Sequence, residues 1–302
     1  MARKRRGRAI HGWLILDKPL GVSSAQAVAK ARWALEAQKA GHAGTLDPLA
    51  TGVLAVAFGE ATKTVALVQD GLKTYRFGIR LGQATKTDDA EGAVIAESAE
   101  RPSDHAIETA LDGFRGDILQ VPPLYSAVKA NGARAYDLAR AGAVPELAPR
   151  PLWVERLDLV ARDGPDQATL DLVCGKGGYV RSIARDLGRA LGCHAHVSEL
   201  RRIASGAFTE ADALSFDALD AVRAGERTAP LLPVETGLAS LPEIPVDAAA
   251  AGDLRQGRSL SAPDCTDGPA WASHGGQAVA LCSVADGRLR PNRVLLHGQD
   301  SA

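Results

Sequence analysis

The chain has 302 residues, of which 46% are hydrophobic and 24% are charged, a composition typical of ordinary soluble globular proteins. Its formal net charge is -1 at pH 7, which excludes a polycationic chain and leaves only local basic patches for binding nucleic acid. No apolar run reaches the roughly 20 residues of a membrane helix, and the 4 cysteines form no C-x-x-C pair, so we expect a cytoplasmic protein without a membrane span or a disulfide framework.

The chain begins with the basic segment MARKRRGR, and residues 1–9 are predicted to form a disordered head that can seek phosphates. Strand and helix patterns follow this head. Apolar runs or alternation predict strands at residues 9–16, 52–58, 74–81, 152–160, 168–174 and 195–208. Helical periodicity predicts helices at residues 23–36, 61–68, 102–114 and 177–192. Ser23 or Ser24 would cap the first helix and Ser103 the third.

Two segments of the first 235 residues lack a clear period. Residues 41–51 are predicted to be a loop. Residues 121–150 are the second irregular segment, and they carry four cations and two tyrosines: Lys129, Arg134, Arg140, Arg150, Tyr125 and Tyr136. Long loops inside a compact domain usually serve a function or are disordered, so both segments are candidates for the functional site.

The character of the sequence changes after Asp220. Residues 229–246 are rich in proline and are predicted to be a linker or a docking strand. Short strand signals at residues 278–285 and 293–298, separated by Gly, Asp and Pro turns, predict a small β domain. Strands and helices that alternate irregularly, followed by a short β-rich tail, favour an α+β protein of about two domains.

The stretch GHAGTLDPLATGVL, residues 41–54, surrounds one carboxylate, Asp47, with three glycines and a proline. Its glycines permit backbone angles and close approaches that side chains disfavour. Pro48 favours an extended backbone at Asp47, and the apolar strand that follows should place this carboxylate at the edge of a cleft. An aspartate before a proline also commonly begins an Asx turn, so on these grounds a purely structural role stays open.

The order of residues in this loop resembles the catalytic loop of the TruB-type tRNA pseudouridine synthases. Five further segments resemble the same family in the same order: LDKPLGVSS (16–24), KTYRFGIRLGQATKTDDAEG (73–92), VPPLYSAVKANGARAYDLAR (121–140), GGYVRSIARDLG (177–188) and AHVSELRR (195–202). The likeness spans roughly the first 235 residues. In the tail, GRLRPNRVL (287–295) resembles the small PUA-like RNA-binding domain of the family.

The resemblance implies an α+β pseudouridine-synthase fold with a mixed, mainly antiparallel central sheet flanked by helices and loops. Residues 10–238 would form the catalytic domain, with 121–150 as an RNA-binding thumb, and residues 239–302 a β-rich PUA-like domain. The implied reaction isomerises uridine 55 in the T-loop of tRNA to pseudouridine, on a flipped-out base and without a cofactor or metal ion. Asp47 would be the nucleophile or charge stabiliser. Whether Asp47 attacks the sugar, attacks the base or removes a sugar proton stays open.

Arg181 lies in the first turn of a predicted helix, where a cation is unfavourable by about 0.3–1 kcal/mol. It therefore needs a partner. The resemblance pairs Arg181 with Asp47, and a neighbouring arginine keeps a carboxylate ionised and oriented. The alternative is an ordinary surface arginine, such as Arg185 further along the helix.

The resemblance assigns roles to five further residues. Tyr75 would stack on the target base, since an aromatic ring stacks readily on a flipped nucleotide. Tyr179 and Leu200 would line the pocket. Lys18 would lie near the active site, and His42 would fill the gap that the flipped nucleotide leaves. From the residues alone, purely structural alternatives stay open. Tyr75 would be a half-buried strand tyrosine, Tyr179 and Leu200 would pack in the core, Lys18 would lie in a turn, and His42 would be a loop histidine.

Three functions remain: a stand-alone tRNA pseudouridine synthase, a guide-RNA-dependent relative that works in a protein complex, and a non-catalytic RNA-binding or tRNA-folding protein. The thumb-like insertion at 121–150 favours the first, because it resembles the RNA-gripping insertion of the stand-alone enzymes. The presence of Asp47, Tyr75 and Arg181 together argues against the third. We therefore expect a monomer whose partner is the T-arm of tRNA, with no obligatory protein partner.

Overall fold

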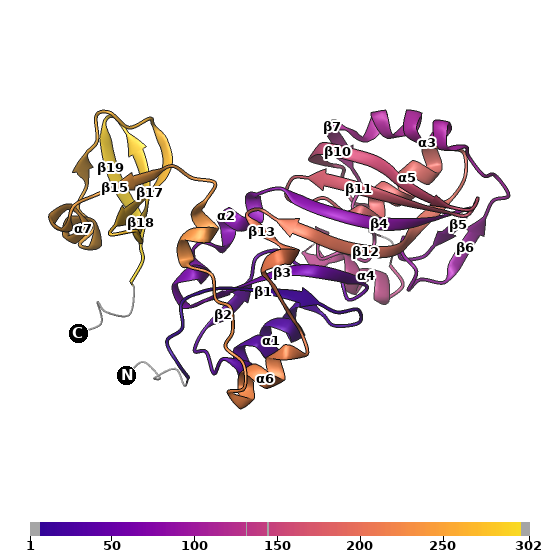
Figure 1. Ribbon diagram of the computed structural model, residues 1–302. Helices are drawn as coiled ribbons and strands as arrows, with labels where there is room; N and C mark the ends of the chain where they lie inside the picture. Colours follow the sequence, from indigo (N-terminus) through magenta and orange to yellow (C-terminus); the bar gives the residue numbers. More distant parts are fainter. Residues whose placement is uncertain (1–6, 131, 144, 297–302) are drawn as a thin grey trace. The chain divides into compact units, whose positions relative to one another are not determined.

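The computed structural model describes residues 7–130, 132–143 and 145–296 (Figure 1). The chain forms two compact units. The first comprises residues up to Asp47, residues 53–71 and residues from Ser205 on; the second comprises residues 48–52 and 72–204. Among the described residues, none of the helices is long and apolar enough to cross a membrane.

The first unit contains a small mixed sheet. Strand β1 (Gly12–Lys18) lies between β14 (Ala213–Ser215), which is parallel to it, and β3 (Ala50–Phe58), which also pairs antiparallel with β2 (Ala40–His42). β1 is buried along almost its whole length, as its apolar run predicts. The helices of this sheet are α1 (Ser24–Ala34), α2 (Val65–Asp70) and α6 (Ala218–Ala224), with 3-10 turns η1 (Gly59–Lys63), η3 (Glu210–Asp212) and η4 (Val234–Leu238).

The first unit also contains the β-rich C-terminal part. Its five strands follow the order β15 (Glu243–Pro245), β17 (Gly268–His274), β18 (Gln277–Ala285), β19 (Arg288–Val294), β16 (Leu260–Ser261). Helix α7 (Ala248–Arg255) packs its buried Leu254 into a core with Val279 and Leu289 of the sheet. Its N-terminus is capped by Asp247, whose Oδ1 accepts from the Ala250 amide at 2.8 Å. The predicted β-rich C-terminal part is confirmed.

The second unit is built on a larger sheet, in which the strand order is β12 (Ala195–Ser205), β4 (Lys73–Leu81), β11 (Gln167–Cys174), β10 (Arg150–Asp163), β7 (Gly116–Gln120). The pairs of β11 with β4 and of β10 with β11 and β7 are antiparallel. The first residues of β3 pair parallel with β12. Helices α3 (Asp104–Leu111) and α5 (Val180–Ala190), the 3-10 turn η2 (Asp112–Phe114) and the hairpin of β5 (Gln83–Thr85) and β6 (Val94–Glu97) complete this unit.

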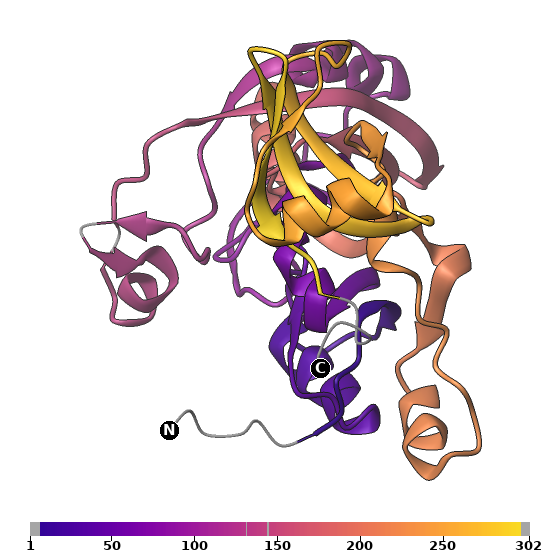
Figure 2. The same ribbon diagram turned by 90° about the vertical axis from the view of Figure 1, so that its left-hand side faces the viewer.

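The segment from 121 to 150, predicted as a thumb, carries the short hairpin β8 (Lys129–Ala130) and β9 (Ala133–Arg134) and the helix α4 (Ala135–Arg140). It stands out from the sheet of its unit (Figure 2). Val128, Ala135 and Leu147 are buried in a small cluster, and Leu124 and Tyr179 pack against them. This cluster gives the segment a core separate from that of the sheet.

The predicted α+β class with a mixed, mainly antiparallel sheet is confirmed. Several local predictions are wrong. The loop predicted at 41–51 contains β2 at one end and the start of β3 at the other, because both strands pair across it. The disorder predicted for residues 1–9 is wrong at Arg8, which forms a parallel β-bridge with Ala37. Residues 1–6 lie outside the described part of the chain. The strand predicted at 293–298 begins earlier, as β19, because this strand pairs with β18 from Arg288.

Candidate active site

A buried hydroxyl binds the backbone of the Asp47 loop. Ser24 Oγ, 3% exposed at the start of α1, accepts from the Leu46 amide at 2.8 Å and donates to the Leu46 carbonyl at 2.9 Å. These two groups belong to the two peptide units on either side of Leu46, and the second peptide unit joins Leu46 to Asp47. Gly44 has a φ of 99°, which an L side chain rarely adopts. The half-buried Asp47 therefore follows directly after backbone whose position is restricted.

The far end of the loop enters the sheet of the second unit. Ala50, Thr51 and Gly52 pair parallel with Leu200, Arg201 and Arg202 of β12. Gly52 has a φ of 97°, and a Cβ built there would lie 2.2 Å from the Arg202 carbonyl oxygen. Only glycine permits this close approach. The pairing places predicted pocket residue Leu200 beside a strand that begins three residues after Asp47.

Lys18 ends β1 and is fully buried. Its Nζ donates to the carbonyl oxygens of Pro19 and Val22, at 3.0 and 2.6 Å. These bonds fold the turn that leads into α1. These contacts are those expected of a turn lysine, the alternative that the sequence left open for Lys18. They also connect Lys18 to the start of α1, where Ser24 lies.

His42 and Tyr75 lie in strands. His42 ends β2, is partly buried and pairs with Val56 of β3. Tyr75 is 9% exposed on the buried side of β4 and lies opposite Leu172 of β11. His42 is thus more exposed as a residue than Tyr75, although its ring Nδ1 is buried.

Arg181 is the second residue of α5, and its guanidinium has three oxygen contacts within the second unit. Nη1 lies 3.4 Å from Oδ2 of Asp89 and donates to the Thr87 carbonyl at 3.1 Å. Nη2 donates to the Tyr125 carbonyl at 3.1 Å. Tyr125 belongs to the thumb-like segment. Arg181 is therefore not an ordinary surface arginine, and the start of the thumb is bound to it.

Asp89, which the sequence did not single out, is a partner of the predicted site residue Arg181. Its other oxygen, Oδ1, accepts from the Glu91 amide at 3.1 Å and from the Thr87 hydroxyl. The Asp89 side chain is 4% exposed. A carboxylate held by these donors keeps its second oxygen directed at Arg181. The signal was present in the segment KTDDAEG, which lies inside a stretch resembling the family but reads as a polar loop.

Asp88, the neighbour of Asp89, serves a different arginine. Its Oδ2 lies 3.0 Å from Arg185 Nη1. Burial raises the pKa of the Asp88 carboxyl, and the Arg185 charge offsets only part of that effect. Its backbone has a φ of 61°, and its carbonyl accepts from the Val197 amide at 3.1 Å. The tight turn thus directs two successive carboxylates to two arginines of α5.

Tyr179 precedes α5 and is held by Gln120, a buried residue at the end of β7. Gln120 Oε1 accepts from the Tyr179 amide at 2.9 Å, and its Nε2 donates to the Tyr179 carbonyl at 3.0 Å. The next carbonyl, of Val121, accepts from Ser182 Oγ and Arg185 Nη2, each at 2.8 Å. The residues that lead into the thumb are therefore hydrogen-bonded to the first turns of α5.

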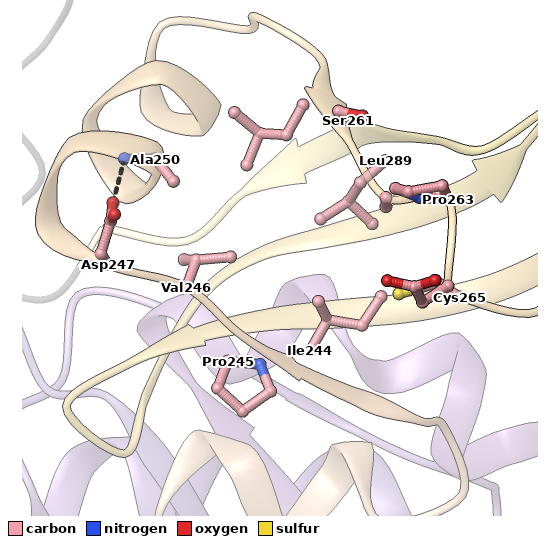
Figure 3. Close-up of a pocket in the computed structure, with 12 residues that line it drawn as sticks. Ile244, Pro245, Val246, Asp247, Ala250, Ser261, Pro263, Cys265 and Leu289 are labelled. Atoms are coloured by element: carbon pink, nitrogen blue, oxygen red, sulfur yellow. Dashed lines mark hydrogen bonds between the residues drawn. The ribbon is translucent and has the colours of Figure 1, made fainter.

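The predicted site residues fall into two sets. Lys18, His42 and Asp47 belong to the first unit, and Tyr75, Tyr179, Arg181 and Leu200 to the second. A cavity of about 400 Å³ lies elsewhere, in the C-terminal sheet, and is lined by residues between Ile244 and Leu289 (Figure 3). The predicted site residues all lie between Lys18 and Leu200, so this cavity is separate from them in the chain.

Comparisons with known protein families match most of the chain. Residues 32–180 match the family described as "TruB family pseudouridylate synthase (N terminal domain)", and residues 181–239 match the "tRNA pseudouridylate synthase B C-terminal domain".

Curated relatives match nearly the whole length. The tRNA pseudouridine synthase B of Dinoroseobacter shibae is 56% identical over 302 residues, which cover 99% of each chain. The protein of the same name from Cereibacter sphaeroides strain ATCC 17025 is 57% identical over 298 residues, covering 97% of this chain and 99% of the relative. That of Gluconacetobacter diazotrophicus is 49% identical over 308 residues, covering 97% and 100%.

Solved structures share the fold. The structure titled "Structure of H/ACA RNP bound to a substrate RNA containing 2'-deoxyuridine" has a TM-score of 0.74 at 22% identity and covers 98% of this chain and 92% of that chain. The one titled "Crystal Structure of a Cbf5-Nop10-Gar1 Complex" has a TM-score of 0.73 at 26% identity and covers 95% and 85%.

Proposed function

The chain belongs to the TruB family of pseudouridylate synthases, and from this premise we propose that it isomerises uridine 55 in the T-loop of tRNA to pseudouridine. The observation that carries the proposal is the 56% identity over 99% of a relative named tRNA pseudouridine synthase B. The reaction breaks the bond between C1′ of the ribose and N1 of the uracil, turns the base and joins C1′ to C5. The C5 proton leaves, N1 gains a proton, and the product is an isomer of the substrate.

Asp47 is the proposed catalytic residue. A carboxylate can attack an electrophilic carbon or stabilise positive charge that develops on the ribose. Its loop supports this role, because the Ser24 contacts with Leu46 on one side and Pro48 on the other restrict the backbone around Asp47. A catalytic group held in one position avoids part of the entropy loss of reaching the transition state.

Arg181 is proposed as the cation that orients the Asp47 carboxylate, and Asp89 as the group that holds Arg181. The burial of the Arg181–Asp89 pair supports this role, because a buried charge without a partner costs several kcal/mol, on the order of 3–5 when one partner is removed. Two backbone carbonyls restrict the guanidinium further. Such an arginine is well oriented for a second carboxylate.

The substrate base is proposed to leave its stack and to lie against the ring of Tyr75, with Tyr179 and Leu200 lining the pocket. His42 would occupy part of the gap left by the nucleotide, which offsets the cost of a few kcal/mol for base flipping. Lys18 is proposed to act near the site through the turn it folds, since its ammonium binds the Pro19 and Val22 carbonyls.

The RNA grip is proposed to be divided among the basic head (residues 1–9), the thumb-like segment 121–150 and a PUA-like domain of residues 239–302. Residues 10–238 would form the catalytic domain. The cations Lys129, Arg140 and Arg150 of the thumb and Arg288, Arg290 and Arg293 of the C-terminal strand β19 support this division. Phosphate contacts would make binding strongly dependent on salt.

We propose that the protein works alone, as a cytoplasmic monomer, without a guide RNA. The identity of 56% to a tRNA pseudouridine synthase B, against 22–26% to chains from the two H/ACA or Cbf5 complexes, supports this choice over a guide-dependent subunit. The test is incubation of the purified protein with unmodified tRNA, followed by primer-extension mapping of pseudouridine. Product at position 55 without any added protein or guide RNA is expected. Product that requires a guide would favour the alternative.

A further inference from the structure

One buried side chain holds the peptide that precedes the proposed nucleophile. Ser24 Oγ accepts from the Leu46 amide at 2.8 Å and donates to the Leu46 carbonyl at 2.9 Å. Both residues are almost fully buried. The hydroxyl thus donates its proton to the carbonyl of Leu46 and accepts the proton of the Leu46 amide. Leu46 directly precedes Asp47 in the chain.

This arrangement fixes position more than it supports helix α1. The N-cap of α1 is the preceding residue, Ser23, whose side chain accepts from the Gln26 amide while Gln26 accepts from the Ser23 amide. Ser24 is the first helical residue, where its side chain is not needed for capping. Its two bonds reach 22 residues along the chain to the loop instead.

The turn before α1 is itself braced. Lys18 Nζ binds the carbonyls of Pro19 and Val22, so the backbone that delivers Ser24 is fixed from strand β1. The order of contacts runs from the sheet through Lys18 and its turn to Ser24, and from Ser24 to the peptide before Asp47. A displacement of Ser24 would therefore shift the peptide unit that joins Leu46 to Asp47.

We propose that Ser24 is a positioning residue for the reaction: its hydroxyl sets the place of Asp47 through the Leu46 peptide. The proposal rests on the proposed function, in which Asp47 is the reacting carboxylate. A shift of about 1 Å in a catalytic group can cost roughly 100-fold in rate. Loss of the Ser24 hydroxyl should therefore lower kcat strongly and leave the binding of tRNA, which depends on distant phosphate contacts, nearly unchanged.

The adjacent serines form a matched pair for the test. Ser23→Ala removes the N-cap and should lower the thermal stability of the protein while sparing turnover. Ser24→Ala places a good helix former at a helical position but deletes both bonds to Leu46. Ser24→Thr keeps the hydroxyl, and Ser24→Cys keeps the size but offers only a weak donor and acceptor. The kcat and KM of steady-state pseudouridine formation, tRNA dissociation constants and melting temperatures are measured for the parent and all four variants.

The expected result is a fall in kcat of roughly 10- to 100-fold for Ser24→Ala, a smaller fall for Ser24→Cys and recovery toward the parent rate for Ser24→Thr, with tRNA affinity unchanged. Ser23→Ala should keep the parent kcat despite its lower melting temperature. If Ser24→Ala does not fold, the order of Ser24→Cys below Ser24→Thr in kcat decides the matter. Parent-like kcat in Ser24→Ala or Ser24→Cys, with an active parent, would overturn the positioning role alone. An inactive parent would refute the proposed function, and the positioning role with it.

Discussion

Arg181 and Asp89 form an ion pair inside the second unit, with 3.4 Å between Nη1 and Oδ2 and side chains that are only 7% and 4% exposed. The pair explains how a cation is stabilised in the first turn of α5, where the helix dipole disfavours it. It also means that the loop of residues 85–92 contributes to the position of Arg181. The orientation of this guanidinium is thus fixed by the second unit before any substrate is bound.

Replacing Asp89 by asparagine should lower kcat by roughly 100-fold, because the amide keeps the shape but not the charge that holds Arg181. tRNA affinity should change little, since Asp89 is buried and cannot contact phosphate. Asp88→Asn is the matched control, because Asp88 pairs with Arg185 instead. Steady-state measurements of kcat for both variants test this: equal losses in the two would show that the whole turn, rather than Asp89, is needed.

Arg181→Lys should reduce turnover by orders of magnitude with little change in tRNA affinity. A lysine carries the charge but lacks the planar fork that reaches Thr87, Tyr125 and Asp89 together. Arg185→Lys is the comparison, because it lies on the same helix and pairs with Asp88 and Asp186. A variant that binds tRNA poorly but turns it over normally would identify Arg181 as a phosphate contact and contradict its proposed role.

Glu60 should contribute to stability in a way that depends on pH. Burial alone would raise its pKa, but the hydrogen bonds from Lys63 and the Leu296 amide, with the Lys63 charge, bring the pKa below its ordinary value of 4.5. Because the pKa of Glu60 is lower in the folded protein than in the unfolded chain, its contribution to stability is fully present above the unfolded pKa of about 4.5. The contribution is lost as pH falls through the folded pKa.

Glu60→Gln should accordingly melt at a lower temperature than the parent at neutral pH, and the gap should close as the pH falls below about 4.5. Thermal melts of both proteins over this range provide the measurement. A gap that stays constant with pH would show that the carboxylate charge of Glu60 contributes nothing.

The thumb should contribute to the salt dependence of tRNA binding. Lys129 in β8 and Arg150 at the C-terminal end of the segment are exposed cations. Removing one cation that binds a phosphate lowers the slope of log affinity against log salt by roughly 0.7–0.9, so Lys129→Ala with Arg150→Ala should flatten it by about 1.4–1.8. Binding measured across a salt series tests this, with Lys30→Ala as a control, since Lys30 pairs with Asp220 on the first unit. An unchanged slope would remove the thumb from the RNA grip.

The sequence predicted the class of the fold and most of its strands because apolar alternation is a local property. β4 illustrates this, since residues 73, 75, 77, 79 and 81 are buried in strict alternation. Short elements such as β2 and α7 were missed. β2 has only three residues, and α7 begins with four alanines, which show no apolar stripe; pairing or packing with distant residues decides whether they form.

For the candidate site too, the sequence could identify some residues and not others. Asp47, Tyr75 and Arg181 could be named because they lie in long motifs that resemble a family. Asp89 and Ser24 lie in such motifs as well, but neither they nor Gln120 could be given a role, because each acts through a contact with a residue 22 or more positions away. A serine at a helix start looks like a cap, and an aspartate in a polar turn looks like a solvated charge. Only the fold shows which backbone groups these side chains bind.

The most direct test of the account compares the parent protein with Asp47→Asn in single-turnover reactions on unmodified tRNA, with pseudouridine mapped by primer extension. The account predicts pseudouridine at position 55 with the parent alone. It predicts no detectable product with Asp47→Asn, together with a tRNA affinity and melting temperature close to those of the parent. Near-normal turnover by Asp47→Asn would contradict the central claim that this carboxylate carries the reaction.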